Sequence, residues 1–135
     1  MKLFSTGSKD TKISFALLLL RLVAGLTMAF SHGYGKLSGY SDMSGGFPDP
    51  IGLGSEVALI LAIFGEFFCG IFVALGLATR LSAIPVIITM AVAFAIIHGG
   101  DPFAKQEMSL IYLAMFSAIF IAGPGKYSID NYISK

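Results

Sequence analysis

Charged residues are scarce in this sequence. They make up 13% of its 135 residues, about half of the share usual in soluble proteins. Hydrophobic residues make up 56%, and the mean hydropathy is +0.82. The net charge is +1 and no run of lysine or arginine occurs, which argues against a nucleic-acid partner. The composition predicts an integral membrane protein whose main partner is the lipid bilayer.

Cysteine is almost absent as well, since Cys69 is the only one. A single thiol forms no disulfide within the chain, which excludes an internal CxxC relay of the kind that quinone-linked thiol oxidases use. We expect Cys69 to pack as a small hydrophobic residue. His32 and His98 have no metal-ligand spacing around them, so we expect no metal or haem site.

Four long apolar segments dominate the chain. About 20 helical residues, with a rise of ~1.5 Å each, cross the hydrocarbon core of a bilayer. We predict an all-α fold, a polytopic antiparallel bundle of four transmembrane helices. The membrane domain is expected at 13–123, between polar tails at 1–12 and 124–135. Its spans are predicted at residues 13–31, 55–77, 81–97 and 106–122.

Four spans place both termini on one side of the membrane, and the basic residues indicate which side. Six lysine or arginine residues fall on the side of the termini, and two fall on the opposite side. Because basic residues concentrate in cytoplasmic segments, both termini are predicted to be cytoplasmic. The first group is Lys2, Lys9, Lys12, Arg80, Lys126 and Lys135; the second is Lys36 and Lys105.

Two charges interrupt the apolar segments, Arg21 in the first and Glu66 in the second. An isolated charge at this depth costs about 3 kcal/mol on insertion scales. Arg21 and Glu66 each lie about ten residues, or roughly 15 Å, from the predicted outer surface. Since the two helices are antiparallel, we predict that Arg21 and Glu66 meet as a buried ion pair, either directly or through a water.

Both charges lie on helix faces suited to close packing. In the second segment, small residues recur every fourth position around Glu66: Ala58, Ala62, Gly70 and Ala74. Such a ridge lets membrane helices approach closely, so Glu66 should point inward. In the first segment, Arg21, Gly25, Met28 and His32 form one helical stripe.

A polar cleft is expected on the outer side, above the predicted Arg21–Glu66 pair. His32 and His98 end the first and third spans on that side. The Gly- and Pro-rich segment 32–54 is long for a plain connection, which favours a lid or a binding loop. A quinone or other amphipathic ligand is the expected occupant, because a histidine or carboxylate could exchange protons with it. The candidate lining residues are Arg21, His32, Lys36, Glu66, His98, Glu107 and Tyr112.

Three ordered segments of this chain resemble the DoxX family. They are LLLLRLVAGLTMAFSHGYGKL (17–37), GEFFCGIFVALGLATRLSA (65–83) and EMSLIYLAMFSAIFIAGPGKYSID (107–130). The resemblance covers about residues 13–130 and implies a four-helix protein of the bacterial inner membrane. The positions that match the family's pattern are Arg21, His32, Gly33, Lys36, Glu66, Arg80, Glu107, Gly123, Gly125 and Asp130.

The resemblance also implies a function. The family takes its name from a subunit linked to quinone-dependent sulfur oxidation, and some members are tied to membrane oxidoreductase and oxidative-stress complexes. It therefore implies a membrane component of a redox system that binds quinone, or a membrane or periplasmic oxidoreductase partner, in the outer cleft. Whether such a protein is itself a quinone-linked oxidoreductase subunit stays open.

Two other functions stay open at this point. The first is a non-catalytic assembly subunit, in which the buried charges only fix the register of the helices. The second is a small transporter, which four spans could form only as a homodimer and for which no inverted repeat is visible.

Overall fold

The computed structural model describes residues 3–134, and every regular element in this range is helical. Three of the elements, labelled η, are π-helical turns, in which the backbone hydrogen bonds reach back five residues. The order is α1 (Thr11–Thr27), η1 (Met28–Gly33), α2 (Tyr34–Ser38), α3 (Tyr40–Met43), α4 (Ser55–Ile63), η2 (Phe64–Phe68), α5 (Cys69–Leu75), α6 (Thr79–Val92), η3 (Ala93–Ile97), α7 (Phe103–Ala122) and α8 (Ile129–Ile133).

These elements join into four continuous helices that are long and apolar enough to cross a membrane. The first three each contain a π-helical turn, whereas the fourth is α7 alone. The predicted all-α architecture with four spans is confirmed. The spans are Thr11–Ser38, Ser55–Leu75, Thr79–Ile97 and Phe103–Ala122.

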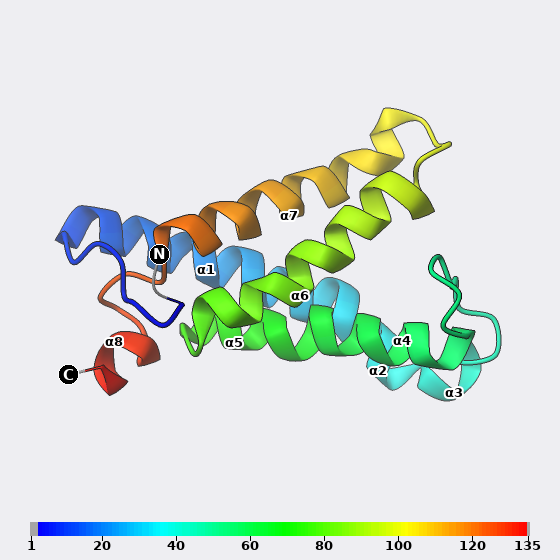
Figure 1. Ribbon diagram of the computed structural model, residues 1–135, viewed down its shortest axis with the longest axis horizontal. Helices are drawn as coiled ribbons and strands as arrows, with labels where there is room; N and C mark the ends of the chain where they lie inside the picture. Colours follow the sequence, from blue (N-terminus) through cyan, green and yellow to red (C-terminus); the bar gives the residue numbers. More distant parts are fainter. Residues whose placement is uncertain (1–2, 135) are drawn as a thin grey trace.

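The two hairpins of the bundle separate from each other along its length (Figure 1). The first span packs against the second through α1 and α5, and α6 packs along α7. Both termini lie at one end of the bundle, here called the terminal end. Toward the other end, here called the loop end, α6 and α7 diverge from α4 and α2.

Local signals fix where the spans begin and end. The Asp10 side chain accepts a hydrogen bond from the Ile13 backbone N–H (3.0 Å) and so caps the start of α1. The second span ends at Gly76, whose φ of +70° lies in the left-handed region that glycine adopts at low cost. The fourth ends at Gly123, directly before Pro124. The predicted ends of these two spans, at residues 77 and 122, lie within two residues of the ends in the structure.

The first and second spans pack closely through glycine. A Cβ atom added at Gly25 would lie 2.5 Å from the Gly70 carbonyl oxygen, which no real side chain tolerates. Gly70 in turn faces Ala29 across the same contact. Two members of the small-residue ridge predicted around Glu66, Gly70 and Ala74, thus pack against the first span.

The outward surface of the spans is apolar. Side chains such as Phe15, Leu19 and Ile121 are each more than half exposed. Apolar surface on this scale is suited to lipid and not to water. The buried cluster at the centre is Ala24, Met28, Cys69, Val73, Ala83, Val86, Met90, Tyr112, Phe116 and Ile119. Cys69 therefore packs in the core, as expected.

The first helix is longer than predicted. The sequence suggests an end near Ser31, because His32, Gly33 and Gly35 follow, but the helix continues to Ser38 and contains 28 residues. Gly33 lies so close to the second span that a Cβ there would be 2.5 Å from the Phe67 nitrogen. Packing against a neighbouring helix, which local propensity does not report, maintains the helix here.

Candidate functional site

Three spans change to π-helical geometry around one cavity. The Tyr34 N–H bonds to the Ala29 carbonyl in η1, Cys69 N–H to Phe64 in η2, and His98 N–H to Ala93 in η3. The first π turn contains His32, the second contains Glu66, and His98 directly follows the third. π turns inside long helices are frequent at functional sites because they redirect side chains.

The cavity lies between the two hairpins toward the loop end and has a volume of about 380 Å³. This volume is within the range of roughly 300–1,000 Å³ that is typical of small-molecule sites. Most of the wall is apolar. Its residues from the second, third and fourth spans are Ala58, Leu61, Ala62, Glu66, Ile88, Thr89, Met90, Val92, Ala93, Ile97, Lys105, Met108 and Ser109, with His98 at the connection between the last two.

The connection between the first two spans forms part of the same wall. It contributes Phe47, Pro48, Pro50, Ile51 and Leu53 to the cavity lining. Local hydrogen bonds hold the end of this loop that precedes α4. The Asp49 carboxylate accepts hydrogen bonds from the backbone N–H groups of Leu53 (2.8 Å) and Gly54 (2.7 Å). The segment expected to act as a lid or binding loop therefore contacts the cavity.

A second contact fixes the start of this loop. The Tyr40 hydroxyl, on α3, donates a hydrogen bond to Glu56 Oε1 (2.8 Å), at the start of α4. This hydrogen bond raises the pKa of the Tyr40 phenol above its ordinary value, because the bond stabilises the protonated form. Tyr40 thus ties the end of the first span to the beginning of the second.

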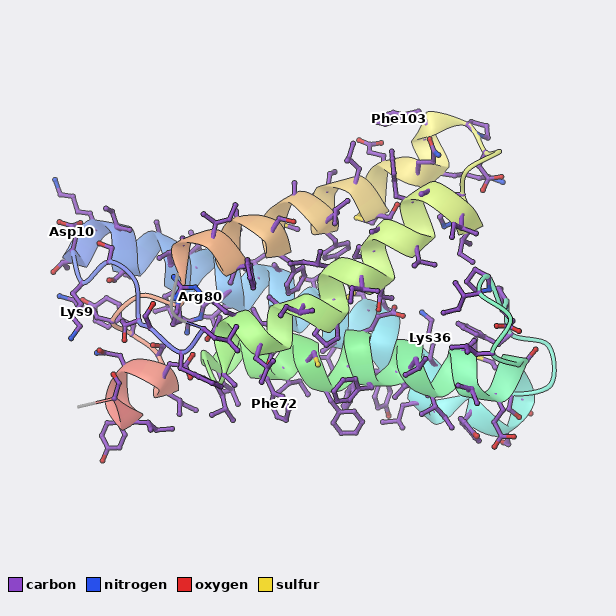
Figure 2. The ribbon with its side chains drawn as sticks, viewed as in Figure 1. Lys9, Asp10, Lys36, Phe72, Arg80 and Phe103 are labelled. Atoms are coloured by element: carbon purple, nitrogen blue, oxygen red, sulfur yellow. The ribbon has the colours of Figure 1, made fainter. Side chains whose placement is uncertain are left out.

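Lys36 and Glu66 form an ion pair in the cavity wall. Lys36 Nζ lies 2.9 Å from Glu66 Oε1 and also donates to the His32 carbonyl oxygen (3.3 Å). The Glu66 side chain is 5% exposed and the Lys36 side chain is 22% exposed. Figure 2 shows Lys36 extending from α2 toward the side on which α6 and α7 lie. The cavity therefore has an ion pair in a mostly apolar wall.

The structure corrects the predicted Arg21–Glu66 pair. Glu66 pairs with Lys36, whereas Arg21 lies beside Ala74, eight residues farther along the second span, or about 12 Å. The prediction placed the end of the first helix at Ser31. Because the helix continues to Ser38, Arg21 lies nearer the terminal end than was expected, and Lys36 is the residue that reaches the level of Glu66.

Arg21 is buried in a separate polar cluster at the terminal end. Only 1% of its surface is exposed. Its guanidinium donates to the carbonyl oxygens of Val73 and Ala74, at the end of α5, and of Pro124 and Tyr127, in the segment that follows α7. Arginine can supply five N–H donors in a fixed plane, and here it connects two chain segments. Arg21 does not line the cavity.

Arg80 and Asp130 complete this cluster, and the prediction of site residues missed both. The Asp130 carboxylate accepts hydrogen bonds from the Ala78 and Thr79 N–H groups (2.7 and 2.8 Å) and thereby caps the start of α6. Arg80 donates to the Phe120 carbonyl oxygen (2.9 Å) and to Ser5. Figure 2 shows Arg80 near the end of α7. The signal for Asp130 in the sequence was the helix breaker at 123–125, which is followed by a single acidic residue.

His32 and Tyr112 contact each other beside the ion pair. Their rings meet edge to face with centroids 5.3 Å apart. His32 is partly buried and lines the cavity, whereas Tyr112 is 3% exposed and supports the imidazole from behind. Of the two histidines that were expected to line the cleft, His32 is therefore the one next to the Lys36–Glu66 pair.

His98 and Glu107 have different positions. His98 lines the cavity and its Nδ1 lies 2.9 Å from Asp101 Oδ2. Glu107 is exposed on α7 and is not part of the cavity lining. The cavity thus brings together His32, Lys36, Glu66 and His98 of the predicted site residues. It also includes Thr89, Lys105 and Ser109, which the sequence did not single out.

Metal ligands are not clustered in the described part of the chain. Residues 3–134 contain no group of three or more His, Cys, Asp or Glu side chains placed to hold an ion. The polar groups of the cavity suit hydrogen bonding to an organic ligand, because they are two ammonium groups, a carboxylate, two imidazoles and two hydroxyls.

The comparison with protein families concerns the cavity and the polar cluster around Arg21. The DoxX family profile matches residues 16–99. The chain belongs to the DoxX family. The match contains Arg21, His32, Lys36 and Glu66, and it ends before the segment that supplies Asp130. No curated protein and no solved structure matches the chain. Together with its four apolar spans, this membership makes it a multi-pass membrane protein.

Proposed function

We propose that this DoxX protein is the membrane component of a redox system and binds a quinone in the cavity at the loop end. The observation that carries the proposal is the chemistry of the cavity wall. A mostly apolar wall suits a quinone ring and its isoprenoid tail, and one charged region around Lys36 and Glu66 suits its polar oxygen atoms.

We propose that the ligand enters the cavity from the lipid. Leu61 and Ile88 both line the cavity, and they are 48% and 58% exposed. A ligand dissolved in the bilayer can therefore reach the wall from between the hairpins. This access supports a lipid-soluble ligand in preference to a water-soluble one.

The electrons of such a system would come from a partner. The sequence has one cysteine, which is buried, so it holds no dithiol of its own that could pass two electrons to a quinone. We propose a membrane or periplasmic oxidoreductase as the partner. Within this arrangement His32 and Glu66 are the groups able to exchange protons with the ligand.

We further propose that the protein lies in a bacterial inner membrane with both termini in the cytoplasm, so that the cavity opens toward the outer side. The excess of lysine and arginine at the terminal end supports this orientation. Fusion of a fluorescent protein that matures only in the cytoplasm to the C-terminus tests it. Fluorescent cells are expected, and dark cells with a full-length fusion in the membrane would contradict the orientation.

Ligand analysis tests the function itself. The protein is purified in detergent, and the solvent extract is examined for quinones by chromatography and mass spectrometry. Added menaquinone and ubiquinone are then titrated onto the purified protein. We expect at least one quinone to bind, and the Lys36→Met variant to bind it about tenfold more weakly, as expected for the loss of ~1.4 kcal/mol. An empty extract together with no binding of either quinone would refute the proposal.

A further inference from the structure

We propose that the Lys36–Glu66 pair makes the cavity selective for the reduced, hydroxyl-bearing form of its ligand, the quinol, over the quinone. The inference rests on the proposed function and specifies which form of the ligand the site recognises. It follows from which atoms of the pair remain available to a bound molecule.

The ammonium of Lys36 supplies a donor. It carries three N–H bonds, and two of them are directed to Glu66 Oε1 and to the His32 carbonyl oxygen. Within residues 3–134 no other acceptor is bonded to it. Lys36 also lines the cavity and keeps 22% of its side chain exposed. One N–H bond therefore remains for an oxygen atom of the ligand.

The carboxylate of Glu66 supplies an acceptor at the same place. Oε1 accepts from Lys36, while Oε2 has no bonded donor among the residues that the structure describes. No buried side-chain nitrogen or oxygen in that range lacks a partner, so Oε2 is not sealed inside the protein. Since Glu66 lines the cavity, the surface that Oε2 reaches is the cavity wall.

A donor and an acceptor side by side match a hydroxyl group. The O–H of a quinol can donate to Glu66 Oε2 while its oxygen accepts from Lys36 Nζ. A quinone carbonyl oxygen only accepts, so it would satisfy Lys36 and place its lone pairs against the carboxylate. A site built to bind a hydroxyl rejects an analogue without one, because the polar groups of the site are then left unpaired.

The apolar part of the wall does not distinguish the two forms. The ring and the tail of the ligand are the same in quinol and quinone, so they contribute equally to the binding of both. Among the other polar side chains of the wall, Thr89 and Ser109 already donate their hydroxyl protons to the carbonyl oxygens of Pro85 and Gln106. The Lys36–Glu66 pair holds a donor and an acceptor side by side, and we assign the preference to it.

The experiment compares three short-chain ligands that share a ring and a tail. These are a menaquinol kept reduced under anaerobic conditions, the corresponding menaquinone, and the dimethyl ether of the menaquinol, which has no O–H donor. Each is titrated onto the purified wild-type protein, with bound ligand measured after separation from free ligand. We expect the menaquinol to bind at least tenfold more tightly than either of the others.

Glu66→Gln identifies the source of the preference. The amide presents an N–H₂ group as well as an oxygen, so it can donate to a quinone carbonyl. We expect the preference for menaquinol to fall to less than threefold in this variant, mainly because the quinone binds more tightly. The matched control is Glu107→Gln, which makes the same change at an exposed position outside the cavity and should keep the preference unchanged.

The outcomes separate this inference from the proposed function. If menaquinone and menaquinol bind wild-type protein equally, or the quinone binds more tightly, the inference is wrong and the quinone-binding function stands. If none of the three ligands binds, the inference is wrong, and the proposed function is wrong as well if ubiquinone also fails to bind. Because the wild-type comparison decides the inference, it does not depend on whether the Glu66→Gln protein can be purified.

Discussion

Glu66 pairs with Lys36 and not with Arg21. Lys36 lies eleven residues closer to the loop end of the first span than Gly25, which contacts Gly70. Arg21 instead donates hydrogen bonds to backbone carbonyl oxygens in another region. The 2.9 Å distance between Lys36 Nζ and Glu66 Oε1 joins the first two spans at the cavity. Arg21 joins the same two spans at the terminal end. The two interactions can therefore be tested independently.

The ion pair should contribute to stability mainly by matching two charges. Lys36→Met leaves a buried carboxylate without its partner, a change that costs about 3–5 kcal/mol in buried pairs and less here because Lys36 is partly exposed. The double variant Lys36→Met with Glu66→Met removes both charges. We expect the single variant to melt at a lower temperature in detergent than the double variant. A double variant that melts as low as the single one would contradict this account.

Arg21 should hold the C-terminal segment against the bundle. In Arg21→Lys the ammonium has three donors and no fork geometry, so it cannot reproduce the bonds to both α5 and residues 124–127. We expect faster amide hydrogen exchange in residues 123–134, with quinone affinity within twofold of wild type because Arg21 lies outside the cavity. Unchanged amide hydrogen exchange in residues 123–134 would show that a lysine at this position holds the C-terminal segment as well as the arginine does.

The glycine contact between the first two spans allows a matched test. Gly25→Ala places a methyl group 2.5 Å from the Gly70 carbonyl oxygen, so the helices must move apart. Gly35→Ala, in α2, meets no atom within 4 Å. We expect Gly25→Ala to lower the melting temperature and Gly35→Ala to leave it unchanged or raise it, since alanine favours a helix by about 0.5–1 kcal/mol over glycine. Equal effects of both substitutions would contradict the close contact.

Asp130 should stabilise the start of α6. Asp130→Ala leaves the Ala78 and Thr79 N–H groups and the Thr79 hydroxyl without their acceptor. Each buried unsatisfied group costs about 1–3 kcal/mol, so a clear loss of thermal stability is expected. Asp42→Ala, at an exposed position in α3, is the control and should have little effect. If Asp130→Ala is as stable as the Asp42→Ala control, Asp130 does not stabilise the start of α6.

Much of the site could be predicted from residue type and helical spacing. His32, Lys36 and His98 were predicted to line a cleft at the outer end of the bundle, with Glu66 below it, and the structure brings all four to one cavity. The partner of Glu66 could not be predicted in the same way. It depended on whether the helix stops at Ser31 or continues, and Gly33, one of the glycines that suggest a stop, is instead a position of close packing against the second span.

The sequence by itself determined that this is a helical protein with four membrane spans, because the length and hydrophobicity of a segment are local properties. It also determined that Glu66 faces inward, since the small residues around it repeat with the helical period. Only the tertiary structure decided which cation Glu66 meets. The register between neighbouring helices depends on glycine contacts between segments about 40 residues apart. A shift of about two helical turns exchanges one partner for another.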